Sequence, residues 1–318
     1  MRIVWALLAL LASTVGAFAV DYPCSLVRII VPYAPGASTD GIGRLVGDRL
    51  QQALGKTVIV ENRPGATGNI GTVAVVNAKP DGCTLLVNAA VIATFPDSFR
   101  KLAYDPFKDL VPVGGLGETP TLLVTRGTND IKDAGALIRS SKEKPEGLTF
   151  STSGYGLIQH LTVEELARRT GAKFLFVPYK GAAESMSDLM TGRVDFASLS
   201  VGSVAPLLED RKLKALGVFS GRRSALVPEV PTLIEQGLPG LDAIVYFLLF
   251  APAATPKETV ALLGAELQRI VGDPALRERF YTIGFEPAPN PSEKMTAIMH
   301  ETRDVWAPVI KRLGIALD

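Results

Sequence analysis

Hydrophobic positions along the chain alternate between two patterns, short continuous runs and helical spacing. Short continuous apolar runs, bounded by Gly, Pro or polar residues, are typical of strands buried on both faces of a sheet. We predict strands at residues 27–33, 57–61, 84–88, 148–152, 174–178, 194–199, 213–220 and 244–251. Apolar residues at helical spacing predict helices at residues 40–54, 70–78, 157–170, 184–191 and 256–271, and a late amphipathic helix at residues 292–314. This alternation indicates an α/β fold with mainly parallel sheets flanked by helices.

Glycine directly follows three of the predicted helices. Gly55, Gly171 and Gly192 each stand just after the last residue with helical spacing. A glycine at this position relieves the strain of the left-handed conformation that ends many helices. These glycines therefore support the predicted helix ends.

Two extended segments interrupt the alternation. Residues 109–130 are rich in Gly and Pro without a helical period, and residues 244–256 form a second extended stretch. Because the segments bracket a compact α/β block, we expect one domain inserted into another, with two hinge crossings between two lobes. The expected first lobe comprises residues 20–121 and 246–318, and the inserted second lobe comprises residues 122–245. The alternative is two additional strands within one large sheet.

Composition narrows the classes of function. Hydrophobic residues make up 47% and charged residues 20% of the 318 positions, as in globular proteins. The formal net charge is +1, so no global field attracts nucleic acid or an anionic membrane. We therefore expect no nucleic-acid partner.

The N-terminus has the pattern of a signal peptide. Arg2 precedes the apolar run "IVWALLALLASTVGAF", and Ala17-Phe18-Ala19 fits an A-x-A cleavage site. We predict a cleaved signal peptide at residues 1–19 and export of the mature chain. The alternative is an uncleaved membrane anchor, which the short apolar core disfavours. No later apolar segment of the sequence is long enough to span a bilayer.

Export of the chain would place its two cysteines in a compartment where disulfides can form. Cys24 and Cys83 are the only cysteines, and each stands near the start of a predicted strand. If the two strands are parallel neighbours, both sulfurs lie at one sheet edge, where a disulfide can form. Two unpaired thiols are the alternative, because the sequence does not fix the Cα separation. Without a His or Cys partner at metal-ligand spacing, we predict no metal site and no cofactor.

The loop after the first predicted strand contains the first candidate site. It reads Pro35-Gly36-Ala37-Ser38-Thr39-Asp40 before a helix, and its last three residues are favourable N-caps. The first N–H groups of a helix have no intrahelical partner and carry partial positive charge. Small residues let a ligand approach them closely. The loop therefore predicts a carboxylate or phosphate site built from the main chain. An ordinary capped turn is the alternative.

Three further strand–helix loops have a similar composition, at residues 63–71, 153–156 and 178–182. In open α/β sheets such loops gather at the carboxyl ends of the strands, where ligands bind. Two loops from each lobe would then face one cleft and favour a small anion. The sequence has no GxGxxG spacing in the loop at 63–71 and no P-loop, so no motif indicates a pyrophosphate.

Single side chains in these loops have structural and functional interpretations. Arg63 either braces its loop, for example through Glu61, or pairs with a ligand carboxylate. His160 lies in the first turn of a predicted helix, where it either donates to an anion or has a structural role. Lys180 is either a ligand contact or a solvated charge. Asp40 either caps its helix or contacts an amino or hydroxyl group of the ligand.

Catalytic patterns are weak. The only histidines are His160 and His300, and the sequence has no GxSxG, HExxH or paired-Cys arrangement. His160 with Glu164 or Glu165 is the one local acid–base candidate, because helical spacing puts Glu164 on its face. We therefore expect a protein that is not an enzyme. A secreted hydrolase or isomerase of small acids is the rival interpretation.

Three longer segments match one known pattern in order. They are residues 28–86, starting "RIIVPYAPGASTDG", residues 176–197, "FVPYKGAAESMSDLMTGRVDFA", and residues 226–263, starting "LVPEVPTLIEQGLPG". Together they resemble the solute-binding proteins of tripartite tricarboxylate transporters, the Bug family. The likeness covers nearly all of the mature chain.

The resemblance implies a periplasmic protein with the two-lobed, type II binding-protein fold. Members of the family close around small organic acids, hold a ligand carboxylate through main-chain groups and waters of the first lobe, and deliver the acid to membrane permease subunits. We expect a monomer that captures a small organic acid and delivers it to such permease subunits. The alternative is that it presents its ligand to a membrane sensor. The expected ligand-binding residues are Tyr33, Ala34, Gly36, Ala37, Ser38, Thr39, Asp40, Ala66, Thr67, Asn69, Ser153, Gly156, Leu157, His160, Tyr179 and Lys180.

The sequence departs from the family pattern at three positions. Ala37 stands where a glycine is usual, Leu157 where Ser or Thr is common, and Leu199 where a polar residue is common. The second and third changes make the second lobe more apolar. We therefore expect a ligand with one carboxylate held by the first lobe and a less polar distal part.

Overall fold

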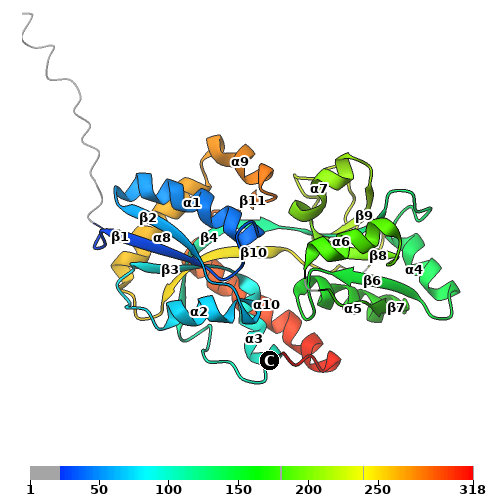
Figure 1. The fold of residues 1–318 in the computed structure, drawn as a ribbon. Helices are drawn as coiled ribbons and strands as arrows, with labels where there is room; N and C mark the ends of the chain where they lie inside the picture. Colours follow the sequence, from blue (N-terminus) through cyan, green and yellow to red (C-terminus); the bar gives the residue numbers. More distant parts are fainter. Residues whose placement is uncertain (1–21, 180, 239, 318) are drawn as a thin grey trace, which may run out of the picture.

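Two sheets, each flanked by helices, form two lobes that lie side by side (Figure 1). The structure is a computed structural model, and it describes residues 22–179, 181–238 and 240–317. The predicted signal peptide and Lys180 lie outside the described residues. Within the described part of the chain, no helix is long and apolar enough to cross a membrane.

The first lobe contains a six-stranded sheet in the order β11-β4-β10-β3-β1-β2. β1 is parallel to β2 and β3, whereas β10 is antiparallel to β3 and β4. The strands are β1 (Leu26–Val31), β2 (Thr57–Asn62), β3 (Thr84–Ala89), β4 (Leu110–Thr119), β10 (Val245–Pro252) and β11 (Glu286–Pro287). The helices are α1 (Ser38–Leu54), η1 (Ala66–Gly68), α2 (Asn69–Val76), η2 (Ala90–Thr94), α3 (Phe95–Ser98), α8 (Lys257–Val271), η3 (Pro274–Leu276), α9 (Arg277–Thr282) and α10 (Ser292–Leu313).

The second lobe contains a five-stranded sheet in the order β7-β6-β8-β5-β9. β6 is parallel to β7 and β8, and β5 is antiparallel to β8 and β9. The strands are β5 (Thr121–Arg126), β6 (Leu148–Thr152), β7 (Phe174–Phe176), β8 (Phe196–Ser200) and β9 (Leu213–Phe219). The helices are α4 (Ala134–Glu143), α5 (Ile158–Thr170), α6 (Ala182–Thr191) and α7 (Val201–Glu209).

The chain crosses between the lobes twice. It passes from β4 to β5 through Pro120, and after β9 it returns through residues 220–244 to β10, which pairs with β4 (Figure 1). The strands on the two sides of each crossing belong to different sheets, so the alternative of one large sheet is wrong.

Both sheets are mixed, whereas the sequence predicted mainly parallel sheets. The difference arises at the crossings, because β10 and β5 enter their sheets antiparallel to their neighbours. Four of the described α-helices were also not predicted, namely α3, α4, α7 and α9. α9 spans only six residues, and α7 contains Pro206, which hides a helical pattern.

The helix α1 packs closely against the first sheet at two of its three glycines. A Cβ at Gly43 would come within 3.0 Å of a Val31 methyl group, and a Cβ at Gly47 within 3.2 Å of a Val60 methyl group. This packing fixes the direction of α1, so that its first turn stays at the carboxyl end of β1.

The predicted disulfide is present and joins Cys24 to Cys83, with a Cα–Cα distance of 5.6 Å. The two cysteines lie at one end of the parallel pair β1 and β3, in which Arg28 is opposite Thr84. The glycine helix ends are also confirmed, because Gly55, Gly171 and Gly192 have φ angles of 62°, 67° and 78°.

One hydrophobic core continues through both lobes. It includes Ile29 and Leu86 of the first sheet together with Phe150 and Phe196 of the second. The helix α10 connects the two parts, because its Arg312 forms an ion pair at 2.7 Å with Glu165 of α5. A smaller core covers the other face of the second sheet.

Candidate functional site

The loop between β1 and α1 is held from within by Asp40. The Asp40 carboxylate accepts hydrogen bonds from Gly36 N–H and from Asn62 Nδ2, both at 2.9 Å, and pairs with Arg44 at 2.9 Å. Although burial raises the pKa of Asp40, these hydrogen bonds lower it below its ordinary value. Asn62 also donates to the Tyr33 carbonyl at 3.0 Å. Asp40 therefore shapes the loop, and its carboxylate has protein partners.

The first turn of α1 leaves main-chain donors without partners. Its N-cap, Ala37, is extended and makes no side-chain cap hydrogen bond. Among the described residues, no acceptor takes a hydrogen bond from the N–H groups of Ser38 and Thr39. Because these groups lie at the positive end of a 17-residue helix, they form a suitable site for an anion.

The second loop of the first lobe has a strained main chain. Gly65, Ala66, Thr67 and Gly68 have φ angles of 128°, 47°, 54° and 91°. Left-handed conformations cost non-glycine residues roughly 1–2 kcal/mol each, and such strain is often found at functional sites. Within the described chain, the N–H groups of Ala66 and Thr67 donate no hydrogen bond.

The two first-lobe loops lie against each other. A Cβ at Gly68 would come within 3.2 Å of the Tyr33 ring, and a Cβ at Gly71 within 2.8 Å of Pro32. Burial raises the pKa of Tyr33 to about 12, so its hydroxyl stays neutral at physiological pH. Tyr104 donates to Asn69 Oδ1 at 3.0 Å and holds the start of α2. The structure thus brings the two sets of free amides onto one wall.

Tyr104 and Asn62 support this wall, although neither was expected from the sequence to take part in the site. Tyr104 lies in an irregular segment with no periodic pattern, and Asn62 is the last residue of β2. An Asn at the carboxyl end of a strand is a usable signal, because its amide can reach loops on either side. No local signal marks Tyr104.

The second-lobe loop between β6 and α5 is braced by His160. The His160 Nδ1 accepts a hydrogen bond from Gly156 N–H at 3.2 Å, and Nε2 lies 3.7 Å from Glu164. The imidazole is 3% exposed and packs at 4.1 Å, between ring centroids, from Phe176. This geometry supports the structural interpretation of His160, which the sequence left open. The N-cap of α5, Leu157, makes no side-chain cap hydrogen bond.

Two other second-lobe candidates, Tyr179 and Ser153, lie where the protein makes its own hydrogen bonds. Tyr179 donates to Asp188 at 2.6 Å, so its hydroxyl has a protein partner. Ser153 lies in the same turn as Gly154, which exchanges hydrogen bonds with Thr152.

In the first lobe, Arg63 pairs with Glu61 at 2.8 Å, in agreement with the bracing interpretation.

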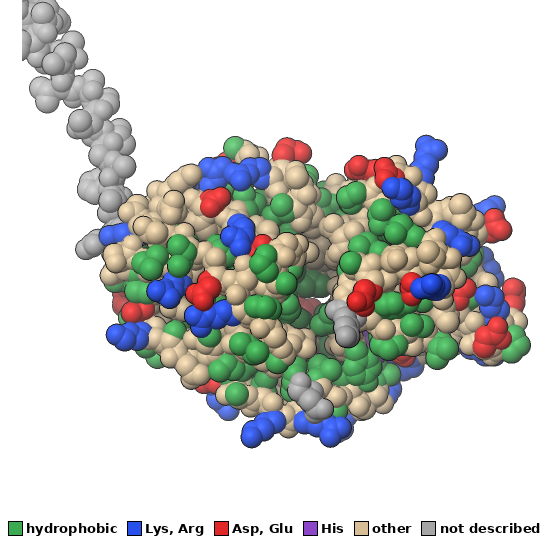
Figure 2. All heavy atoms as spheres, viewed as in Figure 1, with side chains coloured by type: hydrophobic (Ala, Val, Ile, Leu, Met, Phe, Trp, Pro, Cys, Tyr) green, Lys and Arg blue, Asp and Glu red, His purple; other side chains and the backbone are tan. Residues whose placement is uncertain are grey.

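Two large apolar side chains are exposed beside the candidate loops. Ile70 at the start of α2 is 56% exposed, and Tyr155 of the second lobe is 42% exposed. Figure 2 shows the surface hollowed between the two lobes, with charges of both signs scattered around it. The first-lobe candidates meet on one wall, and the second-lobe candidates lie together on their own lobe.

Two lobes that share two crossing segments, with small-residue loops and free helix N-termini, define a two-lobed periplasmic binding protein fold. Residues 42–315 match the family model described as tripartite tricarboxylate transporter family receptor. The chain belongs to this family of transport receptors, which includes the Bug proteins.

Solved structures of similar proteins share the fold. The structure of the periplasmic binding protein BugD matches with a TM-score of 0.78 and 31% identity, over 91% of this chain and 97% of that one. Rpa4515 of R. palustris with adipate matches with a TM-score of 0.84 and 30% identity, over 93% and 100%. MatC of Rhodopseudomonas palustris with bound malate matches with a TM-score of 0.77 and 30% identity, over 91% and 100%.

Proposed function

We propose that the protein is a periplasmic solute-binding protein that captures a small organic carboxylate between its lobes. The free N–H groups of Ser38, Thr39, Ala66 and Thr67 would hold the carboxylate. This proposal depends chiefly on their lack of partners among the described residues. The adipate and malate complexes of two similar proteins support a carboxylate as the ligand class.

The anchoring lobe in this proposal comprises residues 20–121 and 246–318, and the closing lobe comprises residues 122–245. A ligand first binds the anchoring lobe. Contacts from the loops around Ser153 to Leu157 and around Tyr179 then stabilise the closed arrangement, because they are made only when the lobes meet. The remaining proposed contacts are those named from the sequence, including Lys180.

The distal part of the ligand would be less polar than its carboxylate. Ile70 and Tyr155 are exposed beside the loops, and Leu157 replaces the hydroxyl residue that is common in the family. Burying these apolar surfaces against a ligand contributes about 25 cal/mol for each Å² removed from water. An acid with one carboxylate and an apolar or aromatic body would use both features.

Binding without catalysis is the better-supported role. His160, the only local acid–base candidate, is buried and accepts the Gly156 N–H, and Glu165 is occupied by three arginines. The closed protein would deliver its ligand to permease subunits of a tripartite tricarboxylate-type transporter. Presentation of the ligand to a membrane sensor requires the same chemistry.

The cellular location in this proposal is the periplasm, reached through a signal peptide at residues 1–19 that is then removed. The Cys24–Cys83 disulfide supports an oxidising compartment. The mature chain would act as a monomer, since the cleft is completed by its own two lobes.

The experiment that tests the proposal removes one N–H group. Proline is tolerated at the first position of a helix, and Ala37 already has the extended ψ of 156° that precedes proline. Ligands are found by thermal-shift screening of organic acids, with mass spectrometry of small molecules released from the denatured protein. We expect Ser38→Pro to weaken binding of the best acid at least about tenfold, the equivalent of one charge-assisted hydrogen bond.

Two matched variants complete the experiment. Ser38→Ala removes the side-chain hydroxyl but keeps the main-chain N–H group, so this variant should bind the acid nearly as well as the natural chain. Lys257→Pro places proline at the same position of α8, after an N-cap with an extended ψ of 136°. Full affinity in Ser38→Pro, with unchanged thermal stability, would show that the main chain of α1 does not hold the carboxylate.

A further inference from the structure

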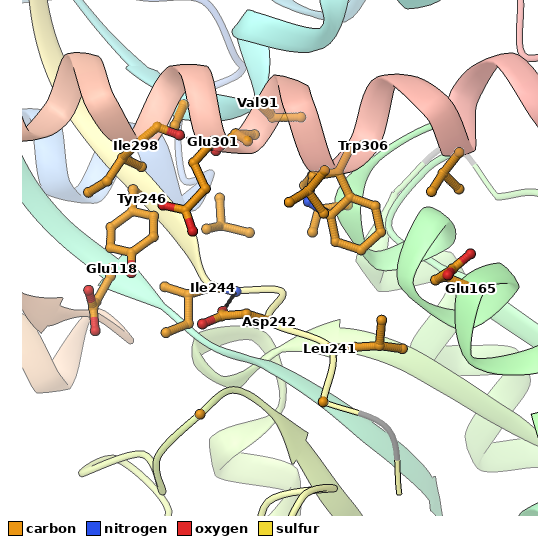
Figure 3. A pocket seen from close by; sticks show the side chains of 18 of the residues that line it. Val91, Glu118, Glu165, Leu241, Asp242, Ile244, Tyr246, Ile298, Glu301 and Trp306 are labelled. Atoms are coloured by element: carbon orange, nitrogen blue, oxygen red, sulfur yellow. Dashed lines mark hydrogen bonds between the residues drawn. The ribbon is translucent and has the colours of Figure 1, made fainter. Parts of the chain in front are cut away.

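A cavity lies between α10, α5 and the segment that returns to the first lobe (Figure 3). Its volume is about 770 Å³. Small-molecule pockets typically enclose about 300–1,000 Å³. None of the described candidate residues of the carboxylate site lines this cavity. It is therefore a separate site, and its chemistry can be considered by itself.

Aromatic and aliphatic side chains form most of the cavity wall. Trp306 of α10 is 4% exposed, and Figure 3 shows its indole directed toward the segment that contains Leu241. Tyr246 of β10 lies below Ile298 in the same view. These groups offer an apolar surface and two aromatic faces, and aromatic faces attract cations.

Two carboxylates face this wall without a cationic partner. Figure 3 shows Glu301 directed from α10 toward Tyr246 and Asp242. Asp242 accepts the Ile244 N–H at 3.0 Å. Within the part of the chain that the structure describes, neither Glu301 nor Asp242 forms an ion pair. Desolvation and the neighbouring Glu301 carboxylate raise the pKa of Asp242, although the Ile244 hydrogen bond and the Arg222 charge oppose them.

The other two carboxylates of the cavity lining, Glu118 and Glu165, are in ion pairs. Glu118 is paired with Arg222, and Glu165 with Arg169 at 2.8 Å. The ammonium of Lys294 forms no ion pair with the described carboxylates. Among the side chains that line the cavity, four carboxylates thus stand against three cations, so the lining itself carries one excess negative charge.

We propose that this cavity binds a small organic cation, with one ammonium group and an apolar, preferably aromatic, body. The ammonium group lies between Glu301 and Asp242, where it relieves their repulsion. The apolar body packs against Trp306, Tyr246 and Leu241. Combined carboxylate and aromatic contacts are a common way to recognise alkylammonium groups.

Tryptophan fluorescence provides a direct test. The sequence has two tryptophans, and Trp5 lies in the predicted signal peptide, so Trp306 inside the cavity is the only reporter in the mature chain. The mature protein is titrated with phenethylammonium chloride and with its neutral isostere 2-phenylethanol, at constant ionic strength. We expect a saturable change with the ammonium compound and binding of the alcohol weaker by about tenfold or more.

Charge variants identify the side chains that bind the ammonium group. In the mature chain, Glu301→Gln and Asp242→Asn should each weaken phenethylammonium binding about tenfold, the equivalent of one lost ion pair. Asp304→Asn, on the same helix but outside the cavity lining, is the matched control and should change the affinity less than about twofold.

Three results would overturn the proposal. The first is equal binding of the ammonium compound and the alcohol. The second is equal weakening by Asp304→Asn and Glu301→Gln. The third is the absence of saturation in a protein whose thermal unfolding is normal. Because both carboxylates are on the surface side of the cavity, the variants should unfold at or above the temperature of the parent. Failure here leaves the carboxylate site untouched, since the two sites share no described residue.

Discussion

Gly202 of α7 and Gly284, just before β11, touch through their main chains and join the two lobes. A Cβ at Gly202 would come within 2.8 Å of the Gly284 Cα, which is closer than side chains pack. Gly202 has no left-handed φ, so alanine there brings no backbone strain. The contact is therefore a point at which the approach of the lobes can be altered without unfolding either one.

We expect Gly202→Ala to hold the lobes apart and to weaken ligand binding about tenfold, because binding selects the arrangement in which the lobes meet. Calorimetric titration measures the affinity, and small-angle X-ray scattering measures the radius of gyration. Gly221→Ala is the control, since a Cβ there would meet no atom within 4 Å. An unchanged affinity together with an unchanged radius of gyration would contradict this prediction.

Ligand preference follows from the apolar second lobe. We expect a simple aromatic acid such as benzoate to compete at least about fivefold better than glutamate or citrate, since extra charged groups would lose hydration without gaining partners. Competitive displacement from the protein, at one pH and ionic strength, measures this order. Clearly tightest binding of citrate would be the opposite result.

Glu165 makes part of the stability depend on pH. Hydrogen bonds from Arg168, and then from Arg169 and Arg312, lower its pKa from 4.5 to about 2, against the opposing effect of burial. A lowered folded-state pKa stabilises the fold above pH 4.5, and this contribution disappears as the pH falls from 4.5 to 2. We expect Glu165→Gln to reduce the free energy of unfolding by about 2 kcal/mol at pH 7.

Urea unfolding at several pH values measures that difference. The gap between the natural chain and Glu165→Gln should narrow steadily below pH 4.5. Glu146→Gln, at an exposed glutamate with no partner within the described chain, should change stability little at any pH. A gap that stays constant down to pH 2.5 would falsify the linkage to Glu165.

The Cys24–Cys83 disulfide closes a long loop, with a sequence separation of 59. Loop-closure entropy predicts that its removal lowers the free energy of unfolding by about 2–4 kcal/mol. Denaturant titrations with and without a reducing agent measure the loss. The double variant Cys24→Ser, Cys83→Ser is the control, and it should be equally stable in both conditions. Equal stability of the reduced and oxidised natural chain would contradict the prediction.

The sequence predicted the elements whose pattern is local. The strands at 57–61, 84–88 and 148–152 were placed to within one residue at each end, because their apolar runs are continuous and bounded by polar or small residues. The direction of a strand is a tertiary property. The antiparallel entry of β10 and β5 therefore had no signature in the local pattern.

The candidate site was predictable to the same extent. The loops around Ser38 and Thr67 were identified because small residues and helix starts are visible in the sequence. The role of His160 was not, since it depends on a hydrogen bond to Gly156 that forms only in the folded loop. The role of Tyr104 was even less predictable, because its hydrogen-bond partner Asn69 lies 35 residues away in the sequence.

The helix α10 has a consequence for the order in which the chain acquires its structure. It follows every other described element in the sequence, yet it packs in the core of a lobe whose first strand begins at Leu26, and it also meets α5 of the other lobe. The described core of either lobe therefore cannot be completed until residues 292–313 have been synthesised.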